Sequence, residues 1–226
     1  MSKKVLEIIM NYEPREYKQS EALNKLDSSY KKNNFANLFS DFGRSGYYDF
    51  LEIGVLEGYG IASFVMDNEE SLVSRNIIGV DLFDTYDFKS YSKFHVQNIL
   101  DELGIANKIE LIQENGFDYL KRQSNIISPD TLLHFDISNH GEIIDEFSLY
   151  LAKFNQIIFE GGSVERDNVK WMKKYEKKSL RDALFNFANR YGYNIYQIND
   201  FPSLTICFIV SASPAWPPQA MLQEEI

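Results

Sequence analysis

A short apolar strand that leads directly into a glycine-rich turn restricts the fold of this chain more than any other feature. Strand-forming residues occupy Leu51–Ile53, and glycines follow at Gly54, Gly58 and Gly60. The apolar run Ile61–Met66 can then open a helix. Glycine tolerates positive φ and lets the backbone approach a ligand closely, and a helix N-terminus offers free N–H groups. The segment therefore predicts a strand–turn–helix unit that binds a small molecule.

Strand and helix patterns alternate after this turn. Helical spacing with an apolar face occurs at Phe94–Leu103 and again at Ile143–Phe154. Apolar runs that fit strands surround these helices, at Ile77–Asp81, Ile109–Ile112, Leu132–Asp136 and Gln156–Glu160. This alternation is typical of a parallel sheet with crossover helices, and it predicts an α/β fold.

The last third of the chain predicts how the sheet ends. Ser179 can cap a helix whose apolar face continues to Gly192, a residue suited to stop it. Two apolar runs follow, at Tyr193–Ile198 and Leu204–Val210, and the short polar segment between them predicts a hairpin. The complete pattern is therefore a seven-stranded, mostly parallel sheet with an antiparallel last strand.

Composition and charge exclude several classes of partner. The chain has 226 residues, enough for one domain with a substantial core, and a formal net charge of −10. Such a charge disfavours a surface that neutralises phosphates, so we expect no nucleic-acid partner. No run of eighteen apolar residues is present, and the segment Met1–Asn11 is short and broken by Glu7. We therefore expect a cytoplasmic protein without a membrane partner.

The composition divides the chain into three parts. Residues 1–46 predict a helical cap, in which Tyr30–Phe42 has aromatic and leucine side chains on one side. Residues 47–211 predict the ligand-binding domain. Residues 212–226 are rich in proline and predict a tail outside the fold. The helical cap either covers the ligand cleft or contributes to a homo-oligomer interface, and both alternatives are open.

The spacing acid-x-Gly-x-x-x-Gly-x-Gly, from Glu52 to Gly60, resembles motif I of class I S-adenosylmethionine (SAM) dependent methyltransferases. The resemblance extends over roughly residues 50–210 and implies a Rossmann-like fold with SAM as the cofactor. It places Glu52 near the amino group of SAM and leaves room for the methionine part at Gly54, Gly58 and Gly60. Tyr59, in the same turn, is a further expected contact with the cofactor.

Two more residues are candidates for the cofactor site. Asp81 ends the second strand, where a carboxylate can accept hydrogen bonds from both ribose hydroxyls. Asn115 follows the third strand, at a position where the methyltransferases that this chain resembles commonly have an aspartate near the adenine amino group. The resemblance therefore implies that the Asn115 amide oxygen makes this bond instead.

The segment Leu133–His140 resembles the strand-four motif of small-molecule and sugar O-methyltransferases, related to macrolide-sugar and catechol-type enzymes. Asp136 is the acid that this motif places at the end of the strand, and it is a candidate for both cofactor binding and catalysis. Metal-dependent members have further ligands after strand five, where this chain has Glu160. Asp136 and Glu160 can hold Mg²⁺ with waters. Without metal, His140 is the expected general base, because imidazole titrates near neutral pH.

We therefore predict a SAM-dependent methyltransferase that O-methylates a small polar molecule, such as a sugar or natural-product intermediate. One alternative is a non-catalytic SAM-binding or scaffolding domain, because Asn115, Asn139 and Gly161 replace residues that relatives use. Another is an NAD-dependent oxidoreductase, since Asp81 lies at a suitable distance after the glycines. The dinucleotide pattern G-x-G-x-x-G, however, breaks at Leu56 and Tyr59.

Overall fold

The computed structural model describes most of the chain, namely residues 2–12, 23–26, 28, 36–46, 48–66, 68–85, 91–200 and 204–211. The predicted tail 212–226 and residues 30–35 of the predicted helix Tyr30–Phe42 lie outside these ranges. In the described part of residues 1–46 the chain is helical over α1 (Ser2–Met10), η1 (Leu23–Lys25) and α2 (Ala36–Ser45). No helix of the described part is long and apolar enough to cross a membrane.

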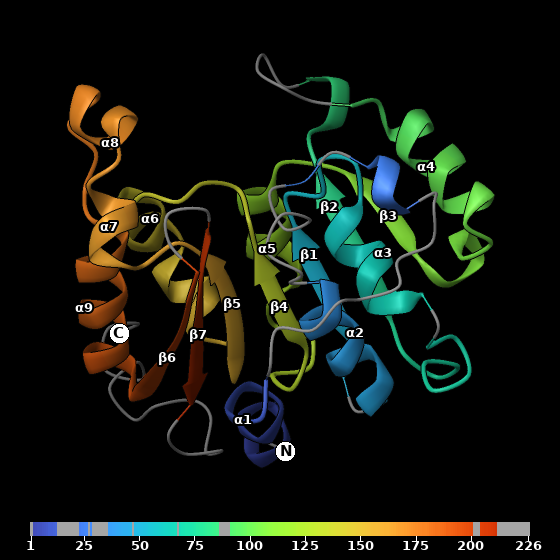
Figure 1. The fold of residues 1–226 in the computed structure, drawn as a ribbon, viewed down its shortest axis with the longest axis horizontal. Coiled ribbons are helices and arrows are strands. Elements are labelled where there is room, and N and C mark those ends of the chain that lie inside the picture. Colours follow the sequence, from blue (N-terminus) through green and yellow to red (C-terminus); the bar gives the residue numbers. More distant parts are fainter. Residues whose placement is uncertain are drawn as a thin grey trace.

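A single seven-stranded sheet forms the centre of the structure, with the strand order β3-β2-β1-β4-β5-β7-β6 (Figure 1). Parallel pairing connects the first five strands, and β7 is antiparallel to both of its neighbours, as predicted. The strands are β1 (Phe50–Ile53), β2 (Ile77–Asp81), β3 (Glu110–Gln113), β4 (Leu132–Phe135), β5 (Gln156–Glu160), β6 (Tyr193–Asp200) and β7 (Leu204–Ser211). The predicted second and fifth strands match β2 and β5 at both ends.

The strand order reverses at the centre of the sheet. The chain moves outward from β1 to β2 and β3, then returns to place β4 on the other side of β1. In open α/β sheets, ligands bind outside the carboxyl ends of the strands at such a reversal. The topology therefore predicts a ligand site at the ends of β1 and β4, which lie at the upper edge of the sheet in Figure 1.

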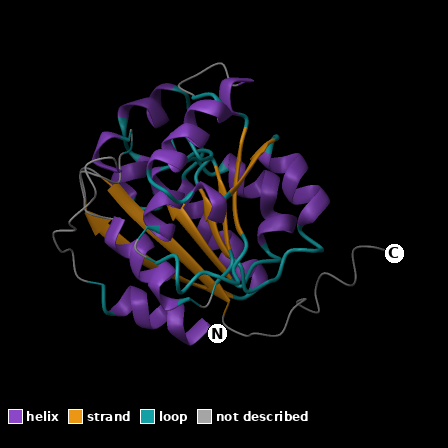
Figure 2. Cartoon of the chain, turned by 90° about the vertical axis from the view of Figure 1, so that its right-hand side faces the viewer, coloured by secondary structure: helices purple, strands orange, loops and turns teal. Residues whose placement is uncertain are grey.

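Helices cover both faces of the sheet (Figures 1 and 2). One apolar core lies between the sheet and α1 to α4, and the other between the sheet and α5, α6 and α9. The remaining helical elements are α3 (Tyr59–Val65), η3 (Phe83–Thr85), α4 (Lys93–Glu102), η4 (Ala106–Lys108), α5 (Gly116–Gln123), α6 (Glu142–Leu151), α7 (Val164–Asp167), α8 (Lys170–Lys174) and α9 (Leu180–Tyr191).

The predicted ends of α9 are confirmed, but the sequence did not predict a second group that caps its N-terminus. The Ser179 hydroxyl accepts a hydrogen bond from the Asp182 N–H at 3.0 Å, and Gly192 ends the helix with φ of 74°. The Asp167 carboxylate, from α7, also accepts hydrogen bonds from the N–H groups of Leu180 and Arg181. Sequence periodicity gave no sign of this second cap, because Asp167 precedes the helix by more than ten residues.

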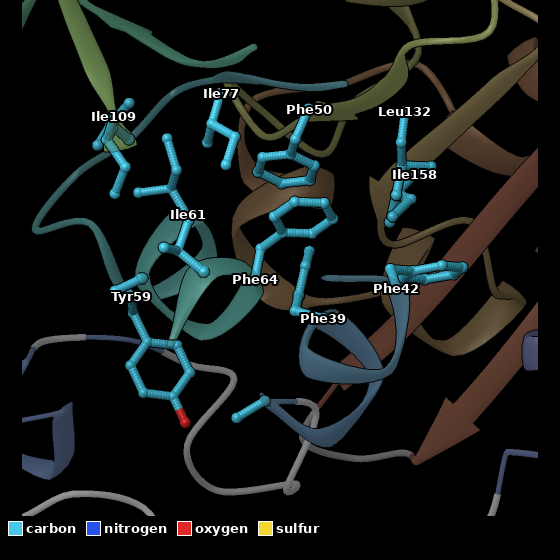
Figure 3. Close-up of a cluster of buried hydrophobic side chains, with 14 of the residues drawn as sticks. Phe39, Phe42, Phe50, Tyr59, Ile61, Phe64, Ile77, Ile109, Leu132 and Ile158 are labelled. Carbon is cyan, nitrogen blue, oxygen red and sulfur yellow. The ribbon is translucent and has the colours of Figure 1, made fainter. Parts of the chain in front are cut away.

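Aromatic side chains fill the core between β1 and the helices α2 and α3 (Figure 3). Phe50, from β1, and Phe64, from α3, stack with ring centroids 4.3 Å apart and an interplanar angle of 14°. Phe39, from α2, meets the Phe50 ring edge-on at 6.3 Å. This cluster joins the helix that follows the glycine turn to the central strand.

Truncating one of these rings should therefore destabilise the whole fold. Phe64 is fully buried, and we expect Phe64→Ala to lower the free energy of unfolding by about 3–5 kcal/mol. Phe94 is 74% exposed on α4, so Phe94→Ala should change it by less than about 0.5 kcal/mol. Urea denaturation of both variants measures the difference. Similar losses in the two variants would contradict the packing described for Phe64.

Candidate functional site

A cavity of about 440 Å³ opens where the strand order reverses. This volume is within the range of about 300–1,000 Å³ that is typical of ligand pockets. Its walls come from the ends of β1, β2, β4 and β5, from the starts of α3 and α5, from α6, and from the N-terminal segment at Ser28. The sequence-predicted residues that line it are Glu52, Gly54, Tyr59, Gly60, Asp81, Asn115, Asp136 and Glu160. Gly58 and His140 are not among the lining residues.

Gly54 allows the ends of β1 and β4 to approach each other. It has a φ of 93°, and a Cβ atom at this position would overlap the carbonyl oxygen of Asp136. Its own N–H donates to the Val80 carbonyl at 2.9 Å. Because any side chain here would force the two strand ends apart, glycine keeps the floor of the cavity closed.

Asp81 fixes the turn that follows Gly54. Its Oδ2 accepts hydrogen bonds from the N–H groups of Val55 at 2.6 Å and Leu56 at 3.0 Å, and Oδ1 accepts one from Phe83 at 2.7 Å. Leu56 has a φ of 51°, a left-handed conformation that needs such support. A carboxylate has about four lone-pair sites. Two of them are taken by the turn and one by the Phe83 N–H after β2, which leaves one for a ribose hydroxyl, whereas the sequence predicted two.

Asn115, which we expected to contact the cofactor, forms a hydrogen bond within the protein. It lines the cavity as the N-cap of α5, and its Oδ1 accepts a hydrogen bond from the Phe117 N–H at 2.9 Å. An amide oxygen has two lone pairs. One lone pair is therefore left for the adenine amino group that we expected this oxygen to contact.

Glu52 and His134 form a buried pair behind the turn. Both lie within the sheet, 2% and 0% exposed, and the His134 Nδ1 is 2.7 Å from the Glu52 Oε1. Burial lowers the pKa of His134, but the hydrogen bond and charge of Glu52, together with the charges of Asp136 and Glu160, raise it above its ordinary value. Glu52 lines the cavity, but its carboxylate is bonded to the protein, which the sequence did not predict.

The structure does not support a magnesium site at Asp136 and Glu160. Both side chains line the cavity, but the Glu160 Oε1 lies 2.9 Å from the Arg166 guanidinium, which neutralises it. The carboxyl group of Asp136 lies 4.0 Å from the His134 Nε2. Within the described ranges, no three His, Cys, Asp or Glu side chains are grouped so that they could hold a metal ion. Mg²⁺ needs several oxygen ligands in near-ideal geometry, and an arginine competes for the one at Glu160.

His140 is turned toward α6 and α8, so the prediction that it faces the cavity is not met. Its Nδ1 lies 2.7 Å from the Glu142 Oε2, and its ring meets the Trp171 ring at 6.5 Å between centroids. The next residue, Gly141, donates its N–H to the Lys178 carbonyl at 2.8 Å. This bond connects the segment before α6 to the residue that precedes the N-cap of α9. Trp171 does not line the cavity either.

The glycine turn is also attached to α4. Glu57 is buried in the turn, and its Oε1 lies 2.8 Å from the His95 Nε2. The Tyr91 ring stacks on the His95 ring at 5.1 Å. His95 lies on α4 with an exposed side chain, and spacing along the chain gives no indication of its contact with the turn.

Several solved structures with this fold are methyltransferases, although no family model and no curated protein matches the sequence. The O-methyltransferase TomG from Streptomyces achromogenes, solved with SAM, matches with a TM-score of 0.62 and 15% identity, over 86% of this chain and 91% of TomG. An O-methyltransferase from Bacillus cereus, in complex with SAH, matches with a TM-score of 0.56 and 14% identity, over 93% and 90% of the two chains. The Podospora anserina methyltransferase PaMTH1, bound to SAH, matches with a TM-score of 0.55 and 12% identity, over 93% and 94%. The chain therefore has the class I methyltransferase fold.

The ion pair between Glu160 and Arg166 predicts that divalent metal has no saturable site in this cavity. Titration of the protein with Mg²⁺ by calorimetry should give no binding isotherm. The variant Arg166→Gln removes this ion pair and provides the matched comparison. Saturable Mg²⁺ binding by the wild-type protein, lost in Glu160→Gln, would contradict this prediction.

Proposed function

We propose that this protein is a SAM-dependent methyltransferase that modifies a hydroxyl group of a small polar molecule. The proposal rests mainly on the glycine turn, whose N–H groups donate hydrogen bonds to Asp81. This turn lies at the edge of a cavity at the point where the strand order reverses. Solved structures with the same fold include O-methyltransferases in complex with SAM or SAH. The residues that line the cavity also fit an adenosine-containing ligand, with Asp81 and Asn115 each retaining an acceptor site.

SAM supplies an activated methyl group, so the protein mainly holds the acceptor in line with it. In this proposal, the turn and Asp81 hold the cofactor, and the acceptor lies at the end of the cavity formed by β4 and β5. Asp136 lines that end as an acidic group at the close of β4. It is our candidate for the group that accepts the hydroxyl proton, because His140 does not line the cavity.

The charge of the cavity restricts the acceptor. Five carboxylate side chains line it, from Glu52, Asp81, Asp136, Glu146 and Glu160, and no Lys, Arg or His is among the described lining residues. An anionic acceptor would lose its hydration without gaining a counter-charge from these walls. We therefore propose an acceptor that is neutral or cationic.

The two alternative functions predict different binding properties. An oxidoreductase would bind NADH, but the turn lacks the dinucleotide glycine pattern. It also belongs to a sheet in which β7, the last described strand along the chain, lies antiparallel between β5 and β6. A non-catalytic domain would bind SAM without turnover. The presence of a well-formed cavity beyond the turn, with Asp136 in its wall, favours an enzyme over a purely structural domain.

Binding of S-adenosylhomocysteine (SAH) tests the cofactor assignment. We expect calorimetry to show one site per chain for SAH and no isotherm for NADH. Asp81→Ala removes the acceptor of three backbone N–H groups, so we expect it to weaken SAH binding by at least about tenfold. The exposed Asp118→Ala, on α5, should bind SAH as the wild-type protein does. Tight NADH binding without a response to SAH would refute the assignment.

A pair of acceptors with opposite charge tests the proposed substrate class. Dopamine and 3,4-dihydroxyphenylacetate have the same reacting hydroxyls but an amine and a carboxylate, respectively, on the side chain. We expect methyl transfer from SAM to favour the amine by at least about tenfold in kcat/KM. Glu146→Gln should reduce this preference, since it removes one negative charge from the cavity wall. A preference for the carboxylate would contradict the argument from cavity charge.

A further inference from the structure

We infer that His134 is a positioning residue that fixes the cofactor-binding turn through Glu52. This inference rests on the proposed function, since it assigns a role within the same site. Neither residue needs to touch the cofactor for the effect to operate, because both act on the backbone that surrounds it.

The register of the sheet brings the two side chains together. Glu52 and His134 are Cα partners in the parallel pairing of β1 with β4. Both therefore point to the same face of the sheet, as adjacent residues of neighbouring strands do. That face is otherwise filled by aromatic rings, with Phe39 at 4.9 Å from the imidazole centroid and Phe50 at 6.4 Å. Water does not solvate the Glu52 carboxylate here, so it depends on the His134 Nδ1 at 2.7 Å.

Glu52 in turn supplies a missing cap to α3. The helix begins after Gly58, which has no side chain to accept a hydrogen bond from the first N–H groups. The Glu52 Oε2 accepts a hydrogen bond from the Ile61 N–H at 3.1 Å and so replaces that cap from a neighbouring strand. Its position consequently decides where the first turn of α3 lies relative to the end of β1.

The third glycine of the motif is explained by the same contact. A Cβ atom at Gly60 would overlap the Glu52 Oε1 and would lie 3.4 Å from the His134 Cε1. A side chain at this position would displace the Glu52 carboxylate from its place behind the turn, so this contact favours glycine independently of any ligand in front of the turn. The three residues form one interlocked unit, which we call the Glu52–Gly60–His134 lock.

His134 also lies close to Asp136, on the side of the cavity that we assign to the acceptor. The His134 Nε2, on the opposite edge of the ring from Glu52, lies 4.0 Å from the Asp136 Oδ2. One imidazole thus lies between the carboxylate that caps α3 and the carboxylate that we assign to the acceptor side. The ring is hydrogen-bonded to the first carboxylate and interacts with the second through charge.

Paired substitutions at His134 test the inference. In His134→Asn, the side-chain amide nitrogen can replace the Nδ1 donor, whereas His134→Leu keeps an apolar volume and removes the donor. We expect His134→Leu to weaken SAH binding by at least about tenfold and His134→Asn to restore it to within about threefold of wild type. Thr131→Val, a buried polar residue just before β4, is the control and should bind SAH normally.

Two further measurements keep the result decisive if His134→Leu fails to fold. Gly60→Ala should weaken SAH binding to a similar extent while His134 remains intact, because the added Cβ displaces Glu52. In ¹H–¹⁵N spectra without ligand, the Ile61 amide signal should stay near its wild-type position in His134→Asn, which keeps the donor to Glu52, and in Thr131→Val. A large shift of this signal in His134→Asn together with normal SAH binding would contradict the inference.

The outcomes separate this inference from the proposed function. If the wild-type protein does not bind SAH, the proposed function is wrong, and the role of His134 in positioning a cofactor-binding turn is wrong with it. If the wild-type protein binds SAH and a folded His134→Leu or Gly60→Ala variant binds it equally well, the inference is overturned while the proposed function stands. Loss in His134→Leu with recovery in His134→Asn supports the role of the Nδ1 donor.

Discussion

Carboxylates from neighbouring strands hold the turn between β1 and α3, and the site depends on this constraint. Asp81 accepts hydrogen bonds from the N–H groups of Val55 and Leu56, and Glu52 accepts one from Ile61. A turn of glycines and one left-handed leucine has little conformational preference of its own. Because its N–H groups bond to side chains anchored in the sheet, the turn is rigid before any ligand arrives. Such preorganisation lowers the entropic cost of binding.

The same acidic groups serve the fold and the site together. Asp81 braces the turn and lines the cavity, and Glu52 caps α3 while its other oxygen bonds to His134. This double use has an electrostatic consequence, because the structural carboxylates leave the cavity lined with negative charge. Glu160 and Glu52 are exceptions, since Arg166 lies against Glu160 and His134 against Glu52. The cavity is thereby suited to a cationic cofactor such as SAM and unsuited to an anionic acceptor.

The sequence predicted the site residues where the position of a side chain follows from the end of a strand. Asp81 and Asp136 end parallel strands, so the topology alone brings them to one edge of the sheet, and both line the cavity. His140 lies beyond the strand end, where loop hydrogen bonds decide the direction of each side chain. There the Gly141 N–H bonds to the Lys178 carbonyl and turns His140 toward Glu142. Spacing along the chain contains no information about a bond to a residue almost forty positions later.

The sequence by itself determined the order of the strands and of the helices α3, α4, α6 and α9, the antiparallel last strand, the place of the glycine turn and the ends of α9. These follow from periodicity and capping, which depend on residues close together in the chain. Only the tertiary structure decided that Glu52 is paired with His134, 82 residues further along, and that Arg166 neutralises Glu160. The physical reason is that strand register and loop packing bring distant side chains together, and burial then makes each charged group depend on the partner it meets.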